Sequence, residues 1–172
     1  MLVILMMRAM LSSIGDTETL RAIEVMILSS ISLFSCQLLK AIIFSIKEKK
    51  LDIKMLFTTG GFPSSHTSTV TTMVVSIAIF QITDSGKIDY VFAVAFIVAL
   101  IIIHDAFGVR YEASKHAAIL NKMVENETLE EKKKLGFGKK GYLKELLGHK
   151  KTEVFAGAIY GFLISLLAFL LH

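Results

Sequence analysis

The stretch Gly60–Ser68, GGFPSSHTS, combines a turn, a helix start, several hydroxyl groups and an imidazole directly before an apolar run. Its paired glycines allow the backbone to approach a ligand closely, and Pro63, the only proline, favours the φ angle of a first helical turn. Ser64 or Ser65 is the expected cap of that helix. The free N–H groups and positive dipole end of such a helix favour a bound phosphate. The simpler alternative is a helix cap followed by a polar His66 near a membrane surface.

The composition around this stretch is that of a membrane protein. The chain has 172 residues, of which 53% are hydrophobic, and its mean hydropathy is +0.63. These values are far from those of soluble domains, and a helix of roughly 20 residues crosses a bilayer core. Apolar runs with polar flanks therefore predict an all-α, polytopic membrane bundle of about four transmembrane helices. The runs are residues 25–46, 67–83, 90–103 and 154–171.

The positive charges predict the orientation of this bundle. Of the 19 Lys and Arg residues, four lie in Lys47–Ser65 and eleven in Asp105–Lys151, whereas the connection Ile82–Asp89 holds only Lys87. Because cytoplasmic loops are enriched in Lys and Arg, we expect both rich loops in the cytoplasm and an integral protein of the plasma (inner) membrane. Charges that flank membrane runs give little support to a nucleic-acid partner.

One domain is expected over residues 1–172, with an N-terminal segment at 1–20 and a polar cytoplasmic loop at 122–141. Met1–Leu11 is apolar but short and contains Arg8, which disfavours a signal peptide. It is either an interfacial helix or part of a further crossing. The single cysteine, Cys36, excludes an intrachain disulfide.

Charged residues occur inside the first apolar run and directly after the third. Lys40 lies six residues, roughly 9 Å, before the end of the first run. It either snorkels to the interface or faces a polar cavity and holds an anion. His104, Asp105 and Arg110 follow the third run directly. Asp105 and Arg110 either pair at the interface or join His66 in a shared site, because the topology brings them to the same membrane face.

The last run begins with residues that recur every fourth position, namely His149, Glu153, Gly157 and Gly161. This spacing predicts one helical face. The glycine pair allows another helix to pack closely, and the histidine and glutamate are expected to hydrogen-bond. A carboxylate that holds an imidazole orients a basic or nucleophilic histidine. The alternative is a surface histidine beside a glutamate at a helix start.

These residues resemble the divergent branch of the type 2 phosphatidic acid phosphatase and vanadium haloperoxidase superfamily. The resemblance lies in three segments, GGFPSSHTS, HDAFGVRYEASKHAAILNK and LKELLGHKKTEVFAG. The superfamily has a P-S-G-H motif, which resembles Pro63–His66, and a later S-R-x5-H-x3-D motif, of which His149 and Glu153 resemble the H-x3-D part. The chain departs from the pattern in three ways: Ser65 replaces the glycine, K-x6-R-P is missing, and Leu143 stands where the arginine is expected.

The resemblance implies hydrolysis of a phosphomonoester through a phosphohistidine, with no metal and no cofactor. His149 is the implied nucleophile, Glu153 orients it, and His66 acts first as acid and then as base. The implied phosphate ligands are Ser64, Ser65, Arg110, Lys40 and Lys144. Asp105 and Gly61 are supporting candidates.

The expected partner is an amphiphilic phosphate in the bilayer, a lipid or polyprenyl phosphate or pyrophosphate whose tail stays in the membrane. The competing class is a transporter or binding protein that holds an anionic lipid headgroup without cleaving it. A transporter is expected to have polar residues along the whole depth of the bundle. A homo-oligomer is left open.

Overall fold

The computed structural model describes residues 16–49, 56, 60–145 and 148–171, and the segment Met1–Leu11 lies outside these ranges. Every regular element within them is a helix, which confirms the expected all-α class. The helices are α2 (Thr17–Glu48), α3 (Ser65–Ser85), α4 (Tyr90–Phe107), α5 (Val109–Met123), α6 (Leu129–Lys134) and α7 (Lys151–Leu170).

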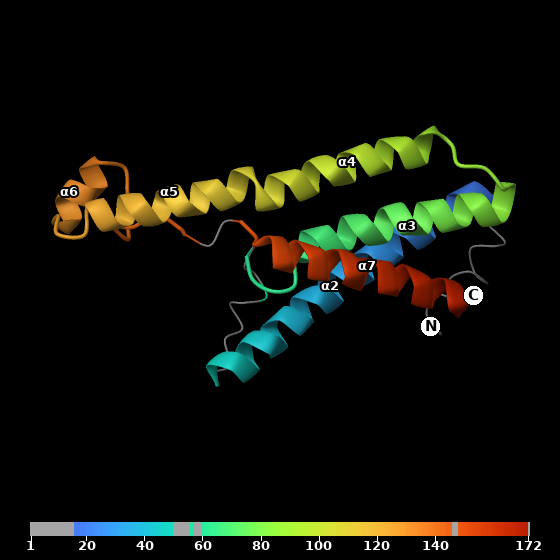
Figure 1. Cartoon of the computed structure of the whole chain (residues 1–172), viewed down its shortest axis with the longest axis horizontal. Helices are drawn as coiled ribbons and strands as arrows, with labels where there is room; N and C mark the ends of the chain where they lie inside the picture. The colour runs from blue at the N-terminus through green and yellow to red at the C-terminus, as the bar shows by residue number, and fades with distance from the viewer. Residues whose placement is uncertain (1–15, 50–55, 57–59, 146–147, 172) are drawn as a thin grey trace.

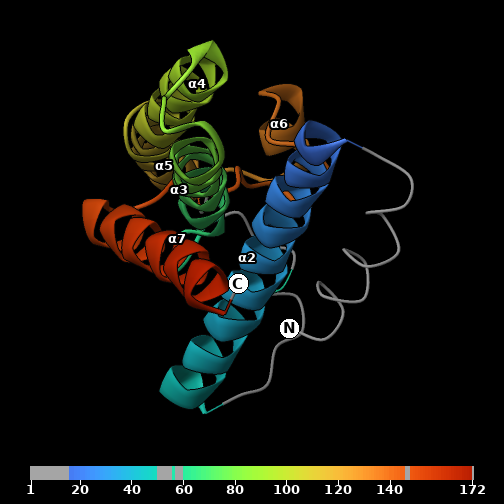
Figure 2. The same cartoon turned by 90° about the vertical axis from the view of Figure 1, so that its right-hand side faces the viewer.

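α3 lies at the centre of the bundle and packs against α2, α4 and α7 (Figure 1). α4 and α5 follow each other in nearly the same direction, so α5 and α6 extend away from the other helices. α2 crosses the bundle at an angle, as the view in Figure 2 shows. The starts of α3 and α7 lie near each other, because the N–H of Ser64 donates to the carbonyl of Glu153. The turn between α3 and α4 lies at the other end of α3.

Three helical stretches in the described part are long and apolar enough to cross a membrane: α2, α4 with its continuation α5, and α7. α3, the remaining expected span, has 21 residues but is not in this set. Its many Ser and Thr side chains lower its hydropathy. A helical membrane bundle is thus confirmed, and the helix at its centre is the one richest in Ser and Thr.

The buried hydroxyl groups in the middle of α3 face other helices, as expected for polar residues inside a membrane bundle. The Oγ1 of Thr72 donates to the Oγ of Ser32 at 2.8 Å, and Ser32 also bonds to Ser68. One turn further along, the Oγ atoms of Ser76 and Ser165 are 3.1 Å apart. All five side chains are at most 2% exposed. These bonds join α2, α3 and α7 around a polar axis that satisfies its own hydrogen-bonding groups.

α7 packs on α3 through the two glycines that the sequence singled out. A Cβ atom at Gly157 would lie 2.4 Å from the carbonyl oxygen of Ser64, and one at Gly161 would lie 2.3 Å from that of Ser68. Both obstacles are backbone atoms, so a rotamer change does not remove the clash. The predicted close helix contact is confirmed.

Gly157→Val is therefore expected to destabilise the bundle by about 3 kcal/mol or more, because α7 has to move away from α3. Ala158→Val, the neighbouring position on α7, is the matched control and should lose far less. The measurement is thermal unfolding of purified protein in detergent. Equal melting temperatures for the two variants would contradict the packing described here.

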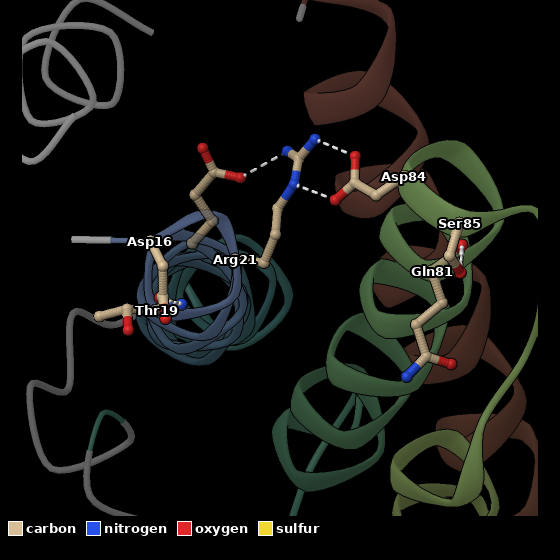
Figure 3. A network of polar contacts seen from close by, with 7 residues as sticks. Asp16, Thr19, Arg21, Gln81, Asp84 and Ser85 are labelled. Atoms are coloured by element: carbon tan, nitrogen blue, oxygen red, sulfur yellow. Dashed lines mark hydrogen bonds and ion pairs between the residues drawn. The ribbon is translucent and has the colours of Figure 1, made fainter.

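A charged network ties α2 to α3 at the end of the bundle where α2 begins. The guanidinium of Arg21 donates two 2.7 Å bonds to the carboxylate of Asp84 and one 2.9 Å bond to Glu24, as Figure 3 shows for the first pair. Arg21 also lies over the ring of Phe80, 4.4 Å from its centroid. The Asp16 carboxylate accepts the N–H of Thr19 and caps α2, so this helix begins before the apolar run at residues 25–46.

The expected polar loop at 122–141 contains a short helix. α5 ends at Met123, and α6 follows with a capping box in which Thr128 and Glu131 hydrogen-bond reciprocally. Beyond α6 the chain returns along α5 towards the start of α7. The side chain of Asn121 holds this return by donating to the carbonyl of Leu143 at 2.9 Å and accepting its N–H at 2.7 Å.

Candidate active site

The segment that carries His149 docks on the end of α4. α7 begins at Lys151, so the expectation of one continuous helical face from His149 to Gly161 is wrong for the histidine, while Glu153 lies in the first turn of the helix. The His149 N–H donates to the carbonyl of Ala106 at 2.9 Å. Carbonyl groups in the last turn of a helix lack intrahelical partners, so the end of α4 supplies a free acceptor that fixes the histidine backbone.

Glu153 holds the His149 ring, which confirms the expected contact between them. Nδ1 of His149 and Oε2 of Glu153 are 3.0 Å apart, and the same oxygen accepts the N–H of Lys150 at 3.1 Å. A neutral imidazole that donates from Nδ1 carries its lone pair on Nε2. That Nε2 atom is buried and has no hydrogen-bond partner among the residues the structure describes.

Ser64 is the N-cap of α3, one of the two caps expected from the sequence. Its Oγ lies 3.0 Å from Oγ1 of Thr67, and its N–H donates to the carbonyl of Glu153 at 3.0 Å. Ser64 thereby joins the start of α3 to the start of α7. Pro63 precedes this cap, so it does not occupy the expected position in the first helical turn, because the cap itself takes the extended conformation at φ −74° and ψ 112°.

Ser65, the first residue of α3, differs from Ser64 in its hydrogen bonding. Its side chain is fully buried, and its Oγ lacks a hydrogen-bond partner within the described ranges. The N–H groups of Ser65 and His66 belong to the first helical turn, where no intrahelical acceptor exists. The positive end of the α3 dipole coincides with these donors, which favours an anion at this position.

Lys40 reaches the same region from α2. Only 1% of the residue is exposed, so the side chain does not extend to the surface. Its Nζ has no hydrogen-bond partner in the described part of the chain. Cys36, one helical turn earlier, lies with its Sγ 3.9 Å from the carbonyl oxygen of Pro63, so this face of α2 packs against the turn before α3. Lys40 is also close enough to Glu153 for their charges to interact.

His66 lies beside His149 at an exposed edge of this region. The ring centroids are 6.4 Å apart with planes tilted by 60°, so the rings do not stack. Charges on Lys40, Arg110 and Asp105 are near enough to act on the His66 ring. Arg110 forms an ion pair with Asp105, and its side chain is 54% exposed. The arginine is thus near the histidines, with its charge shared with a carboxylate.

Gly61 and Lys144, the other two expected site residues, do not contact the histidines in any interaction of the described residues. Gly61 takes a φ of 102°, which requires the conformational freedom of glycine in the turn before α3. Lys144 is exposed on the returning segment, and no contact in the described residues joins it to the histidines. It lies beside Leu143, where the superfamily pattern has its arginine.

The residues that position the His149 segment were not predicted from the sequence. A Cβ at Gly148 would lie 2.3 Å from the backbone nitrogen of Tyr111 on α5, so only glycine fits there. Its N–H donates to the Oγ of Ser114 at 3.4 Å, and this hydroxyl also bonds to the carbonyl of Glu145. These contacts join residues far apart in the chain, which no local pattern reveals.

Positive charge, hydrogen-bond donors and a histidine with a free nitrogen lie in one region, where α2, the end of α4 and the starts of α3 and α7 adjoin. Three buried polar atoms there lack partners among the described residues: Lys40 Nζ, Ser65 Oγ and His149 Nε2. An ammonium, a hydroxyl and an oriented imidazole suit a bound oxyanion. In the described ranges no group of three or more His, Cys, Asp or Glu residues is placed to hold a metal ion.

Comparison with known proteins gives two matches. A family model described as the divergent PAP2 family matches residues 22–164. The chain is also 38% identical over 147 residues to a Bacillus subtilis (strain 168) protein described as the uncharacterized membrane protein YuiD. The aligned region covers 81% of this chain and 90% of that protein. No solved structure matches. The family match includes every candidate site residue from Lys40 to Glu153.

Proposed function

The chain belongs to the divergent PAP2 family of membrane proteins, and on this basis we propose that it hydrolyses the phosphomonoester of a membrane lipid through a phosphohistidine intermediate. The observation that carries the proposal is the convergence of Lys40, Ser65 and His149, whose buried polar atoms lack partners in the described residues. Burial of a lone ammonium costs several kcal/mol, so a fold keeps it when an anion compensates the charge.

In the first step, Nε2 of His149 attacks phosphorus and the bond from phosphorus to the leaving oxygen breaks. Glu153 keeps the reactive lone pair on Nε2 by accepting from Nδ1, and it stabilises the positive charge that the ring gains. His66 donates a proton to the leaving alkoxide. The 6.4 Å between the rings supports placement of the phosphoryl group between nucleophile and acid.

In the second step, His66 takes a proton from water, and the resulting hydroxide attacks phosphorus. The P–N bond breaks, its electron pair returns to Nε2, and inorganic phosphate leaves. In both steps Lys40, the Ser65 hydroxyl and the first N–H groups of α3 face the phosphoryl oxygens and stabilise their negative charge. Ser64 acts on this site through the helix cap, and Arg110 and Lys144 are peripheral candidates.

A purified-protein assay of phosphate release from lipid phosphates, with and without orthovanadate, tests this function. Orthovanadate adopts the five-coordinate geometry of the phosphoryl transfer, so it should inhibit release competitively. It should also raise the melting temperature of the protein, because a ligand that binds only the folded state stabilises it.

Absence of turnover on diacylglycerol, prenyl and polyprenyl phosphates would overturn the phosphatase proposal. If lipid phosphates still raised the melting temperature in that case, the alternative of a headgroup-binding or transport protein would be favoured. The buried hydroxyl axis between α2, α3 and α7 is the feature of the fold that such a protein would use.

A further inference from the structure

α5 extends away from the bundle, and among the described helices it packs only against α4 (Figure 1). Its other tertiary partner is the segment that returns along it from α6 and leads to His149. Ser114 and Asn121 of α5 both bond to this segment, and the proposed mechanism gives neither of them a task. The side chains by which α5 contacts the rest of the fold are therefore those that hold the segment of the nucleophile.

The Ser114 hydroxyl bonds to two backbone groups of this segment. It donates to the carbonyl of Glu145 and accepts the N–H of Gly148 at 3.4 Å. A hydroxyl has one donor and two acceptor lone pairs, so donation to Glu145 leaves the oxygen able to accept from Gly148. Gly148 directly precedes His149, whose own N–H donates to Ala106 at 2.9 Å. Two consecutive amide groups of the segment are thus held by α4 and α5.

Asn121, about two helical turns beyond Ser114, fixes the acceptor that orients the Ser114 hydroxyl. Its side-chain amide pairs with both backbone groups of Leu143, and its Nδ2 also lies 2.7 Å from Oε1 of Glu145. Positions i and i+7 share one face of a helix, so Ser114 and Asn121 face the same segment. Hydrogen bonds in series strengthen one another. Asn121 therefore supports the bond of the Ser114 hydroxyl through Glu145.

The position of the His149 ring depends on contacts from two sides. On the α5 side, a Cβ at Gly148 would lie 2.3 Å from the backbone nitrogen of Tyr111, so the segment has no room to move closer to this helix. On the α7 side, Oε2 of Glu153 lies 3.0 Å from Nδ1 of His149. Glu153 fixes the direction of the ring, and the contacts with α4 and α5 fix the backbone from which the ring extends.

We propose that Ser114 is a positioning residue for the nucleophile. It holds the backbone at Gly148 so that Nε2 of His149 is directed at the phosphoryl group, and Asn121 supports it through Glu145. The inference rests on the proposed phosphatase function for the task of His149. Neither Ser114 nor Asn121 contacts the phosphoryl group in the proposed mechanism. Their effect is on geometry, and a displacement of about 1 Å at a reacting atom lowers a rate on the order of 10²-fold.

Phosphoenzyme formation from an aryl phosphate tests the positioning role. Ser114→Ala should slow this step on the order of 10²-fold at saturating substrate. The substrate concentration that half-saturates the step should stay unchanged, because Lys40 and Ser65 still face the anion. Ser114→Thr keeps the hydroxyl and should restore most of the rate. Lys122→Ala, at an exposed position of α5, is the matched control and should behave as the wild type. Asn121→Ala gives the same comparison, with a smaller loss, if Ser114→Ala does not fold. A Ser114→Thr protein as slow as Ser114→Ala would overturn the proposal, as would a change in the half-saturating concentration alone.

Modification by diethyl pyrocarbonate gives a readout that does not need hydrolysis. The reagent acylates a neutral imidazole nitrogen, and His149 is only 2% exposed, so its modification should be slow in the wild type. Ser114→Ala should raise the rate at His149 several-fold, measured by mass spectrometry of the peptides, because the segment is no longer held on α5. The rate at His116, an exposed histidine of α5, should not change.

The two readouts separate this inference from the proposed function. Faster modification of His149 in Ser114→Ala, without turnover in the wild type, would retain the hold on the histidine and reject the phosphatase. Turnover in the wild type, with Ser114→Ala unchanged in both readouts, would retain the phosphatase and reject the positioning role. The same rise in Lys122→Ala would show a general loosening of α5 and also reject that role. A slower reaction with unchanged modification would place the effect of Ser114 elsewhere than on His149 and reject it as well.

Discussion

His149→Ala is expected to form no phosphoenzyme and to lower turnover by a factor on the order of 10⁴ or more, because it removes the atom that bonds to phosphorus in the proposed mechanism. The measurement is trapping of acid-labile, base-stable phosphate on the protein after mixing with a labelled substrate. Each variant is first checked for folding by gel filtration and thermal unfolding in detergent. Phosphate label retained on the alanine variant would exclude this histidine as the nucleophile.

His66→Ala is the matched control, since it removes a neighbouring imidazole with a different proposed task. With an aryl phosphate, whose leaving group needs little protonation, this variant should still complete the first step and accumulate the phosphoenzyme. Glu153→Gln should fall between the two, because the amide oxygen still accepts from Nδ1 but carries no charge to stabilise the ring. Identical kinetics for the two histidine variants would contradict the division of roles.

Lys40→Met is expected to make the protein more stable and nearly inactive. Methionine has a similar length and no charge, so it removes the cost of burying an ammonium, and the gain should be about 1–4 kcal/mol. The same change removes the cation that we propose faces the phosphoryl oxygens, which should cost about 2–4 kcal/mol of transition-state stabilisation. Thermal unfolding and kcat/KM, measured on the same preparation, give both values.

Lys87→Met provides the comparison at an exposed position in the turn between α3 and α4, where we expect a change within about 0.5 kcal/mol. The stabilisation by orthovanadate should be present in this control and absent in Lys40→Met. A Lys40→Met protein that is less stable and fully active would show that the lysine serves the fold and not the anion site.

The features that follow from local sequence were predicted well. Membrane helices depend on the summed hydropathy of consecutive residues, so α2, α4 and α7 could be assigned from the apolar runs. The cap at Ser64 depends on a hydroxyl next to a turn. The contact of Gly157 and Gly161 with α3 depends on a four-residue spacing of small residues.

The contact between His149 and Glu153 was predicted correctly, but for a different reason from the one that the structure shows. The prediction placed both residues on one helical face. The two residues do not lie on one helix. A glutamate in the first turn can reach back to groups before the helix, and Glu153 does so with the N–H of Lys150 and the ring of His149. The same four-residue separation therefore gives a contact both along a helix and across its start.

The sequence alone determined that this protein is a helical membrane protein, and it singled out the residues to which we assign a chemical role in the proposed function. It left Ser64 and Ser65 equivalent, and it allowed Lys40 either to reach the surface or to be buried. Only the tertiary structure separated these cases, capping α3 with Ser64, leaving the hydroxyl of Ser65 unpartnered among the described residues, and enclosing Lys40. The physical reason is that burial and hydrogen-bond satisfaction depend on which distant segments pack together, here α2, α3, the end of α4 and the start of α7, and no local pattern contains that information.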